Sequence, residues 1–583
     1  MPRDPLRYGS FAATALLLAA AVDGVLAYPQ MLLFGGTVVL PTVSVKIALL
    51  LVCLTGAAWL LVSKHRQDVA STSAAPQRAS VGAGRVKLLA SVLLVYLGIH
   101  ATVFSQHPLL YTARGFNAYY FYLLLAPLLV MSGFRVRPKT VVITVLVSAL
   151  PLLVLGFLQS ALGAPLLPVT ASDVSFETHA WKFYGAVRAF SLFSSPASFG
   201  AFLVFAALLC LALVRDTSST GVFTHPRALR IVLLVLFALV LAGLLVTRTR
   251  AVWLHAAFSI ATLLLWPRIT RMPRLLSLLP VVAGVVVLAG IAAFLAAGGT
   301  SMAAAESLLQ RFDGWWYAVS RWMSGDVGTA LFGTGFFQHG TANGTGDLLI
   351  DSTFIGAGLQ IGIVGLALLV LLQTAMWRAL ATAAARRSPL AIAAAAYCAP
   401  WTLLWLQGIA VVPFAIVFLL AILGGVVDQD TDTPGSVSLF TPGSERVLYL
   451  ASLAFAALVV YGALHTPAAQ SGGERWESRV RMKLLQAAQH RHHAWYGRWC
   501  DGVDSLVSFA GRADTGLDDA AAYLPLYGRA VPVDSIGRTP GSGRSYVVIT
   551  TPDGARYQIR DPDGHGYIGS WTVPEEFDRA SWR

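Results

Sequence analysis

Long apolar runs follow one another along most of the chain, and short polar segments separate them. A helix needs about 20 mostly apolar residues to cross the hydrocarbon core of a bilayer, so the pattern predicts about thirteen membrane-spanning helices. They are expected at 8–28, 43–63, 87–106, 117–134, 140–162, 190–214, 229–246, 251–267, 275–297, 351–376, 389–408, 410–427 and 446–464. The stretch 31–42 belongs either to the second of these helices or to a re-entrant loop.

The loops between these runs alternate in charge, and every second loop is basic. The basic residues of these loops are Arg3, Arg7, Lys64, Arg66, Arg78, Arg85, Lys87, Arg135, Arg137, Lys139, Arg215, Arg227, Arg230, Arg268, Arg271, Arg274, Arg378, Arg386 and Arg387. Short cytoplasmic loops of membrane proteins carry an excess of lysine and arginine. The pattern therefore places the N-terminus inside and the other loops outside, of which 163–189 and 298–350 are the longest.

The sequence after residue 464 no longer consists of long apolar runs. A helical stretch near 474–499 precedes extended segments, and "SYVVITTPDGARYQIRD" has the alternation of a β-hairpin with Pro-Asp-Gly at its turn. The expected fold is an all-α polytopic membrane protein over 1–464, followed by a small α+β extracytoplasmic domain over 465–583.

Composition supports a membrane protein. Hydrophobic residues make up 56% of the chain and charged residues 12%, against about 25% charged residues in soluble domains. The net charge of +13 is explained by basic loops that face anionic lipid, so no nucleic-acid partner is expected. The four cysteines have no metal-ligand spacing, and we expect neither a structural disulfide nor a zinc site.

The segment "TRTRAVW" places Arg248 and Arg250 in a short gap between two apolar runs, on the predicted outer side. Arginines at the end of a span are costly unless they meet water, lipid head groups or an anion. They either extend to lipid phosphates or form an anion site, because guanidinium groups match phosphate oxygens. Arg188 and Arg311 lie beside other apolar runs on the same predicted face, which favours a shared diphosphate pocket.

Aromatic residues crowd the same predicted outer loops. They are Trp181, Tyr184, Trp315, Trp316, Tyr317 and Trp322. Aromatic side chains at this depth commonly form a belt at the membrane interface, and they are also the surfaces on which sugar rings stack. Both interpretations stay open.

Two of these segments resemble the bacterial O-antigen ligase and polymerase family. "TRTRAVWLHAA" is similar to its Ser-Arg-Gly-x-Trp segment, with Thr249, Arg250 and Trp253 on the pattern. "RAFSLFSSPASFGAF" is similar to its Arg-x-x-Gly-x-Phe-x-Asn-Pro-Asn segment. Arg188, Phe193 and Pro196 match that pattern, whereas Ser191, Ser195 and Ala197 depart from it.

Two further segments extend the resemblance over residues 85–425. "RFDGWW…LFGTGFF" resembles the family's Arg…Trp…Phe-Gly-x-Gly loop, with Arg311, Gly333 and Gly335 in place. "DSTFIGAGLQIGIVGLALL" is similar to the segment that opens the span after the long outer loop. The tail beyond 465 has no counterpart in the resemblance.

The resemblance implies metal-independent glycosyl transfer in exopolysaccharide or O-antigen synthesis at the bacterial cytoplasmic membrane. The donor would be a saccharide on undecaprenyl diphosphate. Fixed guanidinium groups would stabilise the charge that develops on the leaving diphosphate. The expected catalytic arginines are Arg188, Arg250 and Arg311, and the expected substrate-binding residues are Arg248, Thr249, Trp253, Trp315, Trp316 and Ser352. No cofactor is expected, and possible partners are a chain-length regulator or envelope assembly proteins.

The acceptor hydroxyl needs a proton acceptor. Asp351 is the first candidate, with His339 and Asp347 as alternatives from the preceding loop. Ligases of the family carry histidine at the position matching Asp351, so the aspartate favours a polymerase. Asp351 would also serve well as a helix N-cap, and that interpretation stays open.

Two function classes compete with an enzyme. A transporter would place ionisable residues near the bilayer midplane, where the chain offers Asp23, Lys46 and His100. A non-catalytic scaffold would use the tail to dock an envelope assembly. The arginines gather instead at the predicted outer face, which favours chemistry at that surface.

Overall fold

The computed structural model describes residues 81–104, 116, 120–123, 138–163, 182–183, 186–191, 193, 196–216, 226–296, 315, 319, 322–323, 326–333, 335, 352–385, 388–407, 411–427, 442–465, 481, 485, 488–489, 492–493, 496–510, 537–538, 544–550, 556–560 and 566–570. The expected spans 8–28 and 43–63, and most of 117–134, lie outside the described residues.

The described part of the chain is mostly helical and includes nine helices long and apolar enough to cross a membrane. The membrane-length segments are α4 (Val81–Ile99) with its π-helical extension η1 (His100–Phe104), α7 (Pro138–Leu162), α9 (Pro196–Asp216), α10 (Pro226–Val246), α11 (Arg250–Ile269), α12 (Pro273–Ala296), α15 (Thr353–Ala384), α16 (Pro389–Cys398) with α17 (Trp401–Gln407), and α19 (Pro442–His465). A shorter apolar helix, α18 (Val411–Leu423), packs among them.

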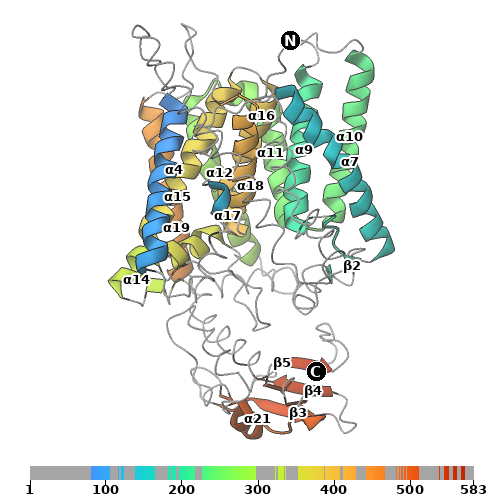
Figure 1. Ribbon diagram of the computed structural model, residues 1–583, viewed down its shortest axis with the longest axis vertical. Coiled ribbons are helices and arrows are strands. Elements are labelled where there is room, and N and C mark those ends of the chain that lie inside the picture. The colour runs from blue at the N-terminus through green and yellow to red at the C-terminus, as the bar shows by residue number, and fades with distance from the viewer. Residues whose placement is uncertain are drawn as a thin grey trace, which may run out of the picture.

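The helices form one bundle (Figure 1), and many of its exposed side chains are apolar. Leu88, Val147, Val232 and Leu450 are each at least 60% exposed, and they come from four different helices. Such an extended apolar surface is unfavourable in water and favourable against lipid. The exposed side chains therefore agree with a multi-pass membrane protein.

Central helices pack closely because glycines remove side chains at the contacts. A Cβ atom on Gly200 would lie 2.7 Å from the Val252 side chain, and one on Gly243 would lie 2.4 Å from Leu153. Small residues at helix contacts let neighbouring backbones approach in membrane proteins. Gly200 thereby brings α9 against α11, directly behind the segment that carries the arginines.

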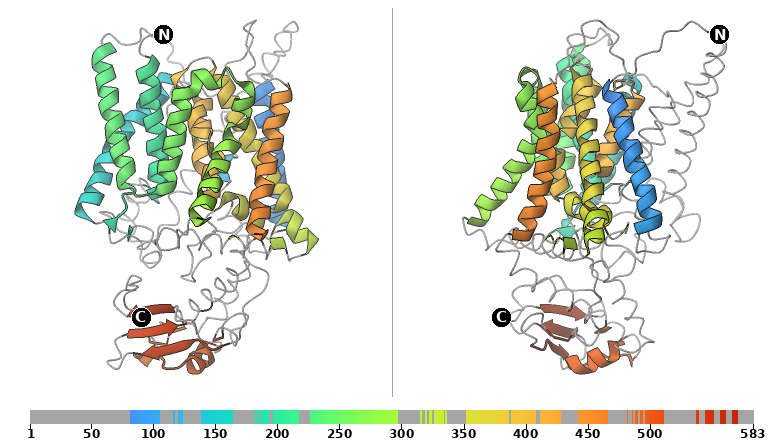
Figure 2. Two further views of the ribbon diagram at one scale, coloured as in Figure 1. Left: turned by 180° about the vertical axis from the view of Figure 1, so that it is seen from behind. Right: turned by 90° about the vertical axis from the view of Figure 1, so that its left-hand side faces the viewer.

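The two ends of the bundle differ in charge. At one end, Glu445 of α19 pairs with Arg85 of α4 and, at 3.0 Å, with Arg378 of α15. The start of α10 and the α11–α12 connection, both basic, lie at this same end (Figures 1 and 2). The structure thus gathers the described basic connections at one end, as their alternation predicts.

The opposite end of the bundle carries α14 (Val327–Phe332) and a short hairpin of β1 (Lys182–Phe183) and β2 (Ala186–Val187). Parts of both long predicted outer loops therefore lie at one end of the bundle, the lower end in Figure 1. The C-terminal sheet lies beyond this same end.

The described tail contains α21 (Val503–Ala510) and an antiparallel sheet in the order β3 (Val547–Thr550), β4 (Arg556–Arg560), β5 (Gly566–Ser570). The pairing of β3 with β4 confirms the predicted hairpin. The tail has its own hydrophobic cluster, which includes Leu485, Trp499 and Leu506. Cys500 belongs to this cluster, and burial raises the pKa of its thiol. An independent extracytoplasmic domain stays a prediction.

Candidate functional site

The turn between α10 and α11 consists of Thr247, Arg248 and Thr249. Arg248 has a φ of +48°, in the left-handed region that most side chains avoid. Thr247 and Thr249 are buried, and the Thr247 hydroxyl donates a hydrogen bond of 2.8 Å to the Leu244 carbonyl. The turn is therefore a fixed structure in which two threonines face inward on either side of a half-buried arginine.

Arg188 binds to both threonines of this turn. Its Nε donates to the Thr247 carbonyl at 3.4 Å, and its Nη2 donates to Thr249 Oγ1 at 2.8 Å. The next residue, Ala189, donates its N–H to the Val246 carbonyl at 3.0 Å. The structure thus brings Arg188, 59 residues away in sequence from Thr247, into the turn that carries Arg248 and leads into Arg250.

Gln159, a fully buried residue of α7, holds the chain that follows Arg188. Its side-chain oxygen accepts the N–H groups of Phe190 and Ser191, at 3.1 and 2.7 Å, and its nitrogen donates to the Ser191 carbonyl at 3.0 Å. Buried backbone groups need such partners where there is no helix or sheet to supply them. Gln159 was missed from sequence, although a single amide inside the apolar run "LLVLGFLQSAL" is a usable signal.

Backbone strain is concentrated beside Arg188. Among the described residues other than glycine, only Ser191 and Arg248 have a positive φ, at +54° and +48°. Each such residue costs on the order of 1–3 kcal/mol, and strain of this kind clusters at functional sites. Both positions flank the Arg188–Thr249 contact, which marks this end of the bundle as the best candidate site.

The start of α11 adds positive potential to the site. Thr249 is the N-cap residue, but its side chain makes no capping hydrogen bond, because its hydroxyl donates to the Thr247 carbonyl and accepts from Arg188. The Thr249 side chain therefore does not offset the partial positive charge of the helix N-terminus at the first turn of α11. Arg250, the first residue of α11, is exposed beside it. Such an arrangement is suited to binding an anion.

The predicted substrate-binding residues fall into two groups. Trp253 is 38% exposed, and its indole N–H donates to the Leu244 carbonyl at 2.7 Å, which fixes the ring beside the turn. Ser352 and Trp315 are instead buried, and Ser352 Oγ donates to the Trp405 carbonyl at 3.3 Å. Both side chains therefore pack inside the protein, and a substrate contact for these two residues stays a prediction. Arg311, His339, Asp351 and Trp316 lie outside the described residues.

The end of the long loop 298–350 is anchored on a break in α15. This helix consists of two segments joined at Gly362, which has a φ of +67°. Gly333, just after α14, meets the break so closely that a Cβ atom on it would lie 2.4 Å from the Gln360 carbonyl oxygen. The N–H of Gly335 donates to that carbonyl at 3.0 Å, and the Tyr96 hydroxyl donates to the Ile361 carbonyl at 2.6 Å.

Side chains at both ends of α14 strengthen this anchor. Asp326 caps α14 by accepting the Thr329 N–H at 2.6 Å, and this hydrogen bond lowers the pKa of its carboxyl. Trp322 packs against Gly358 and donates to the Ala330 carbonyl. His100, which sequence suggested as a mid-span group, lies in η1 and bonds the Phe332 carbonyl. These contacts give His100 a structural role.

One short helix links the two halves of the predicted site. α17 contacts α11, which begins at Arg250, and also α15, which begins directly after Ser352. The Ser352–Trp405 hydrogen bond joins α15 to α17. α17 therefore packs against both of the helices that begin at or next to residues of the predicted site.

Among the described residues, no three histidine, cysteine, aspartate or glutamate side chains lie close enough to hold a metal ion. No protein-family model matches the sequence, and a search of curated proteins finds no relative.

Proposed function

We propose that the protein is a polysaccharide polymerase that transfers glycan from undecaprenyl diphosphate to a growing lipid-linked saccharide. The observation that carries the proposal is the contact of Arg188 with Thr249 at the start of α11, next to Arg248 and Arg250. Arg188, Thr249 and Arg250 also carry the resemblance to the O-antigen ligase and polymerase family.

The proposed reaction places negative charge where these groups lie. The acceptor hydroxyl attacks the anomeric carbon of the donor sugar, and the bond from that carbon to the diphosphate oxygen breaks. The electron pair stays on the diphosphate, and the hydroxyl proton goes to a base. Guanidinium donors held in place before the reaction stabilise the leaving diphosphate without reorganisation. Arg188 meets this requirement through its two threonine contacts.

Asp351 is the proposed base or orienting group for the acceptor. It directly precedes Ser352, whose hydrogen bond to Trp405 fixes the start of α15 against α17. Aspartate in place of the histidine of ligases favours growth of a polymer over transfer to lipid A-core.

The proposal also assigns a side of the membrane to each end. The basic end, with the Glu445 ion pairs, would face the cytoplasm by the excess of arginine in its connections. The Arg188–Thr249 end and the C-terminal tail would then face outward, where lipid-linked saccharides are assembled into polymer.

A transporter is the second candidate, because transporters use helices that are broken at the substrate site. α15 is such a helix, but its residues 363–384 after the break span about 33 Å at 1.5 Å per residue, enough to cross the bilayer alone. The break therefore lies near the membrane boundary. Its carbonyls already bind Gly335 and Tyr96, which favours a loop anchor over an ion site.

Reconstituted transfer separates these functions. Purified protein in proteoliposomes is given lipid-linked saccharide extracted from native membranes, and both glycan length and free undecaprenyl diphosphate are measured. We expect one diphosphate to be released for each unit added. Movement of intact lipid-linked saccharide without diphosphate release would show a transporter. If neither movement nor diphosphate release is observed, the result would favour a scaffold.

A further inference from the structure

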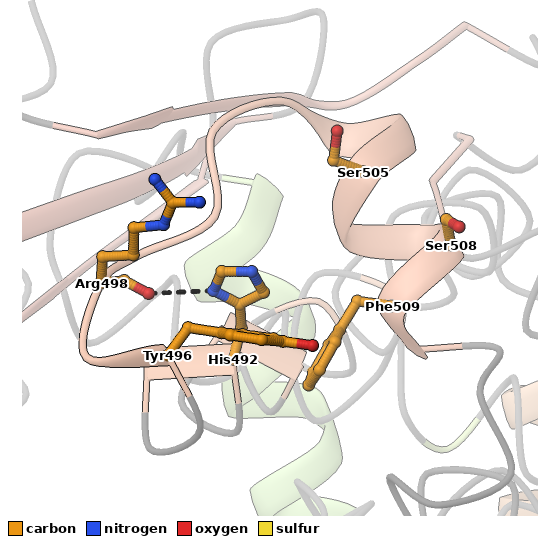
Figure 3. Close-up of a pocket in the computed structure, with 6 residues that line it drawn as sticks. All are labelled: His492, Tyr496, Arg498, Ser505, Ser508 and Phe509. Carbon is orange, nitrogen blue, oxygen red and sulfur yellow. Dashed lines mark hydrogen bonds between the residues drawn. The ribbon is translucent and has the colours of Figure 1, made fainter.

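A second site with its own chemistry lies in the C-terminal tail. A hollow of about 250 Å³ is lined by His492, Tyr496, Arg498, Ser505, Ser508 and Phe509. Figure 3 shows Arg498 and His492 on one wall of this hollow and the α21 side chains on the other. The ring of Tyr496 lies below the imidazole, with its hydroxyl end towards Phe509.

Local structure holds these walls together. His492 and Tyr496 lie four residues apart in a helical stretch, and the chain then turns at Gly497 and Gly502, whose φ values are +68° and +90°. Turns of this kind require the conformational freedom of glycine. The His492 ring packs on both Tyr496 and Phe509, with centroid distances of 4.7 and 5.0 Å. The three rings form one aromatic surface that joins the helical stretch to α21.

A hydrogen bond fixes the polar wall. His492 Nδ1 lies 2.9 Å from the Arg498 carbonyl oxygen. Because a carbonyl only accepts, Nδ1 must carry the proton, and the second ring nitrogen remains for another partner. The imidazole is therefore held in one orientation, with Nε2 on the side of the hollow (Figure 3).

The hollow combines a cation, hydroxyl groups and an exposed ring. The Arg498 residue is exposed, and none of the ion pairs among the described residues involves it. Ser505 and Ser508 lie one helical turn apart on α21, and both are exposed. Tyr496 is 49% exposed. A guanidinium can bind a carboxylate through two hydrogen bonds, the serine hydroxyls offer donors and acceptors to ring hydroxyls, and the aromatic face offers a stacking surface.

We infer that this hollow binds a carboxylate-bearing saccharide, one sugar ring at a time. Arg498 holds the carboxylate, Tyr496 stacks on the ring, and the two serines bind its hydroxyl groups. The volume of the hollow is smaller than that of enclosed small-molecule pockets, which is about 300–1,000 Å³. A hollow of this size suits a single sugar ring, while the rest of the saccharide chain stays in water. The choice of a saccharide over other ring acids rests on the proposed function, because an acidic polymer would leave the transfer site at this end of the bundle.

Binding is tested on the full-length protein in phosphatidylcholine nanodiscs, which present no anionic lipid. Isothermal titration calorimetry with trigalacturonate as the probe and maltotriose as the uncharged comparison gives both affinities. We expect trigalacturonate to bind at least about tenfold more tightly than maltotriose. Arg498→Gln should weaken the binding of trigalacturonate about tenfold, because a hydrogen bond to a charged group contributes about this much. Tyr496→Ala should weaken binding of both saccharides.

Arg544→Gln is the matched control, since Arg544 is an exposed arginine of the tail that does not line the hollow. Its affinity should stay within about twofold of wild type. No binding of trigalacturonate, equal binding of the two saccharides, or unchanged affinity in Arg498→Gln would overturn the inference. Trigalacturonate binding that persists when no glycan transfer is found would refute the proposed function and leave the tail site standing.

Discussion

Replacing Arg188 with alanine should lower the rate of glycan transfer by about 10²–10³-fold, the usual effect of losing one fixed donor to a developing anion. Arg188 contacts Thr247 and Thr249 through two different nitrogens. Lysine has one nitrogen and no planar fork, so Arg188→Lys should also lose most of the activity. The measurement is the initial rate of undecaprenyl diphosphate release in proteoliposomes.

Arg230→Ala is the control for Arg188→Ala. Arg230 is exposed in the first turns of α10, at the basic end of the bundle, so its loss changes the net charge equally. It should retain the wild-type rate within about twofold. Equal rates in wild type and Arg188→Ala would exclude Arg188 from the reaction.

Replacing Gly362 with alanine should destabilise the protein strongly. Gly362 has a φ of +67°, and a Cβ atom on it would lie 2.1 Å from the Leu331 carbonyl oxygen. With ψ at −177°, this conformation is one that essentially only glycine adopts, and it costs another residue about 1–3 kcal/mol. Overpacking adds about 1–3 kcal/mol. We therefore expect a loss of about 2–6 kcal/mol, seen as a lower temperature of thermal unfolding in detergent.

Gly98→Ala separates this local effect from a general loss of glycine. Gly98 lies in α4, and a Cβ atom there would meet nothing within 4 Å. Alanine favours a helix over glycine by about 0.8–1.0 kcal/mol, so the unfolding temperature should stay equal or rise. A Gly362→Ala protein as stable as wild type would mean that α14 is not held against the break in α15.

The ends of most helices could be predicted from hydrophobicity. The expected span 229–246 is observed as α10, Pro226–Val246, and the span 251–267 as α11, Arg250–Ile269. Each of these helices is bounded by arginine, proline or threonine, which are poorly placed inside a bilayer or favoured at helix starts. Local composition is sufficient to predict the ends of a helix where one apolar run forms one helix.

α15 shows where hydrophobicity alone was insufficient. A single span was expected at 351–376, but the helix runs over Thr353–Ala384 and breaks at Gly362. Both segments are rich in apolar residues, so hydrophobicity alone does not predict a boundary between them. The break depends on the close backbone contact with Gly333. The hydrophobic pattern of the sequence does not predict this tertiary contact.

The candidate site was predicted in part. Residue type and shared predicted face grouped Arg188 with Arg248 and Arg250, and the structure brings Arg188 to the turn that carries Arg248. Burial could not be predicted, and the structure buries both Ser352 and Trp315. Gln159 was missed because its importance comes from backbone groups 31 and 32 residues away.

Binding of undecaprenyl diphosphate tests the central claim most directly, because it requires no knowledge of the sugar. Affinities for the diphosphate and for undecaprenyl phosphate are measured in phosphatidylcholine nanodiscs, for wild type, for Arg248→Gln/Arg250→Gln, and for Arg227→Gln/Arg230→Gln at the basic end. We expect wild type to prefer the diphosphate and the first double variant to lose about 10–100-fold in affinity for it. Equal affinities in wild type and the Arg248/Arg250 variant, or an equal loss in the Arg227/Arg230 variant, would contradict a diphosphate site at the start of α11.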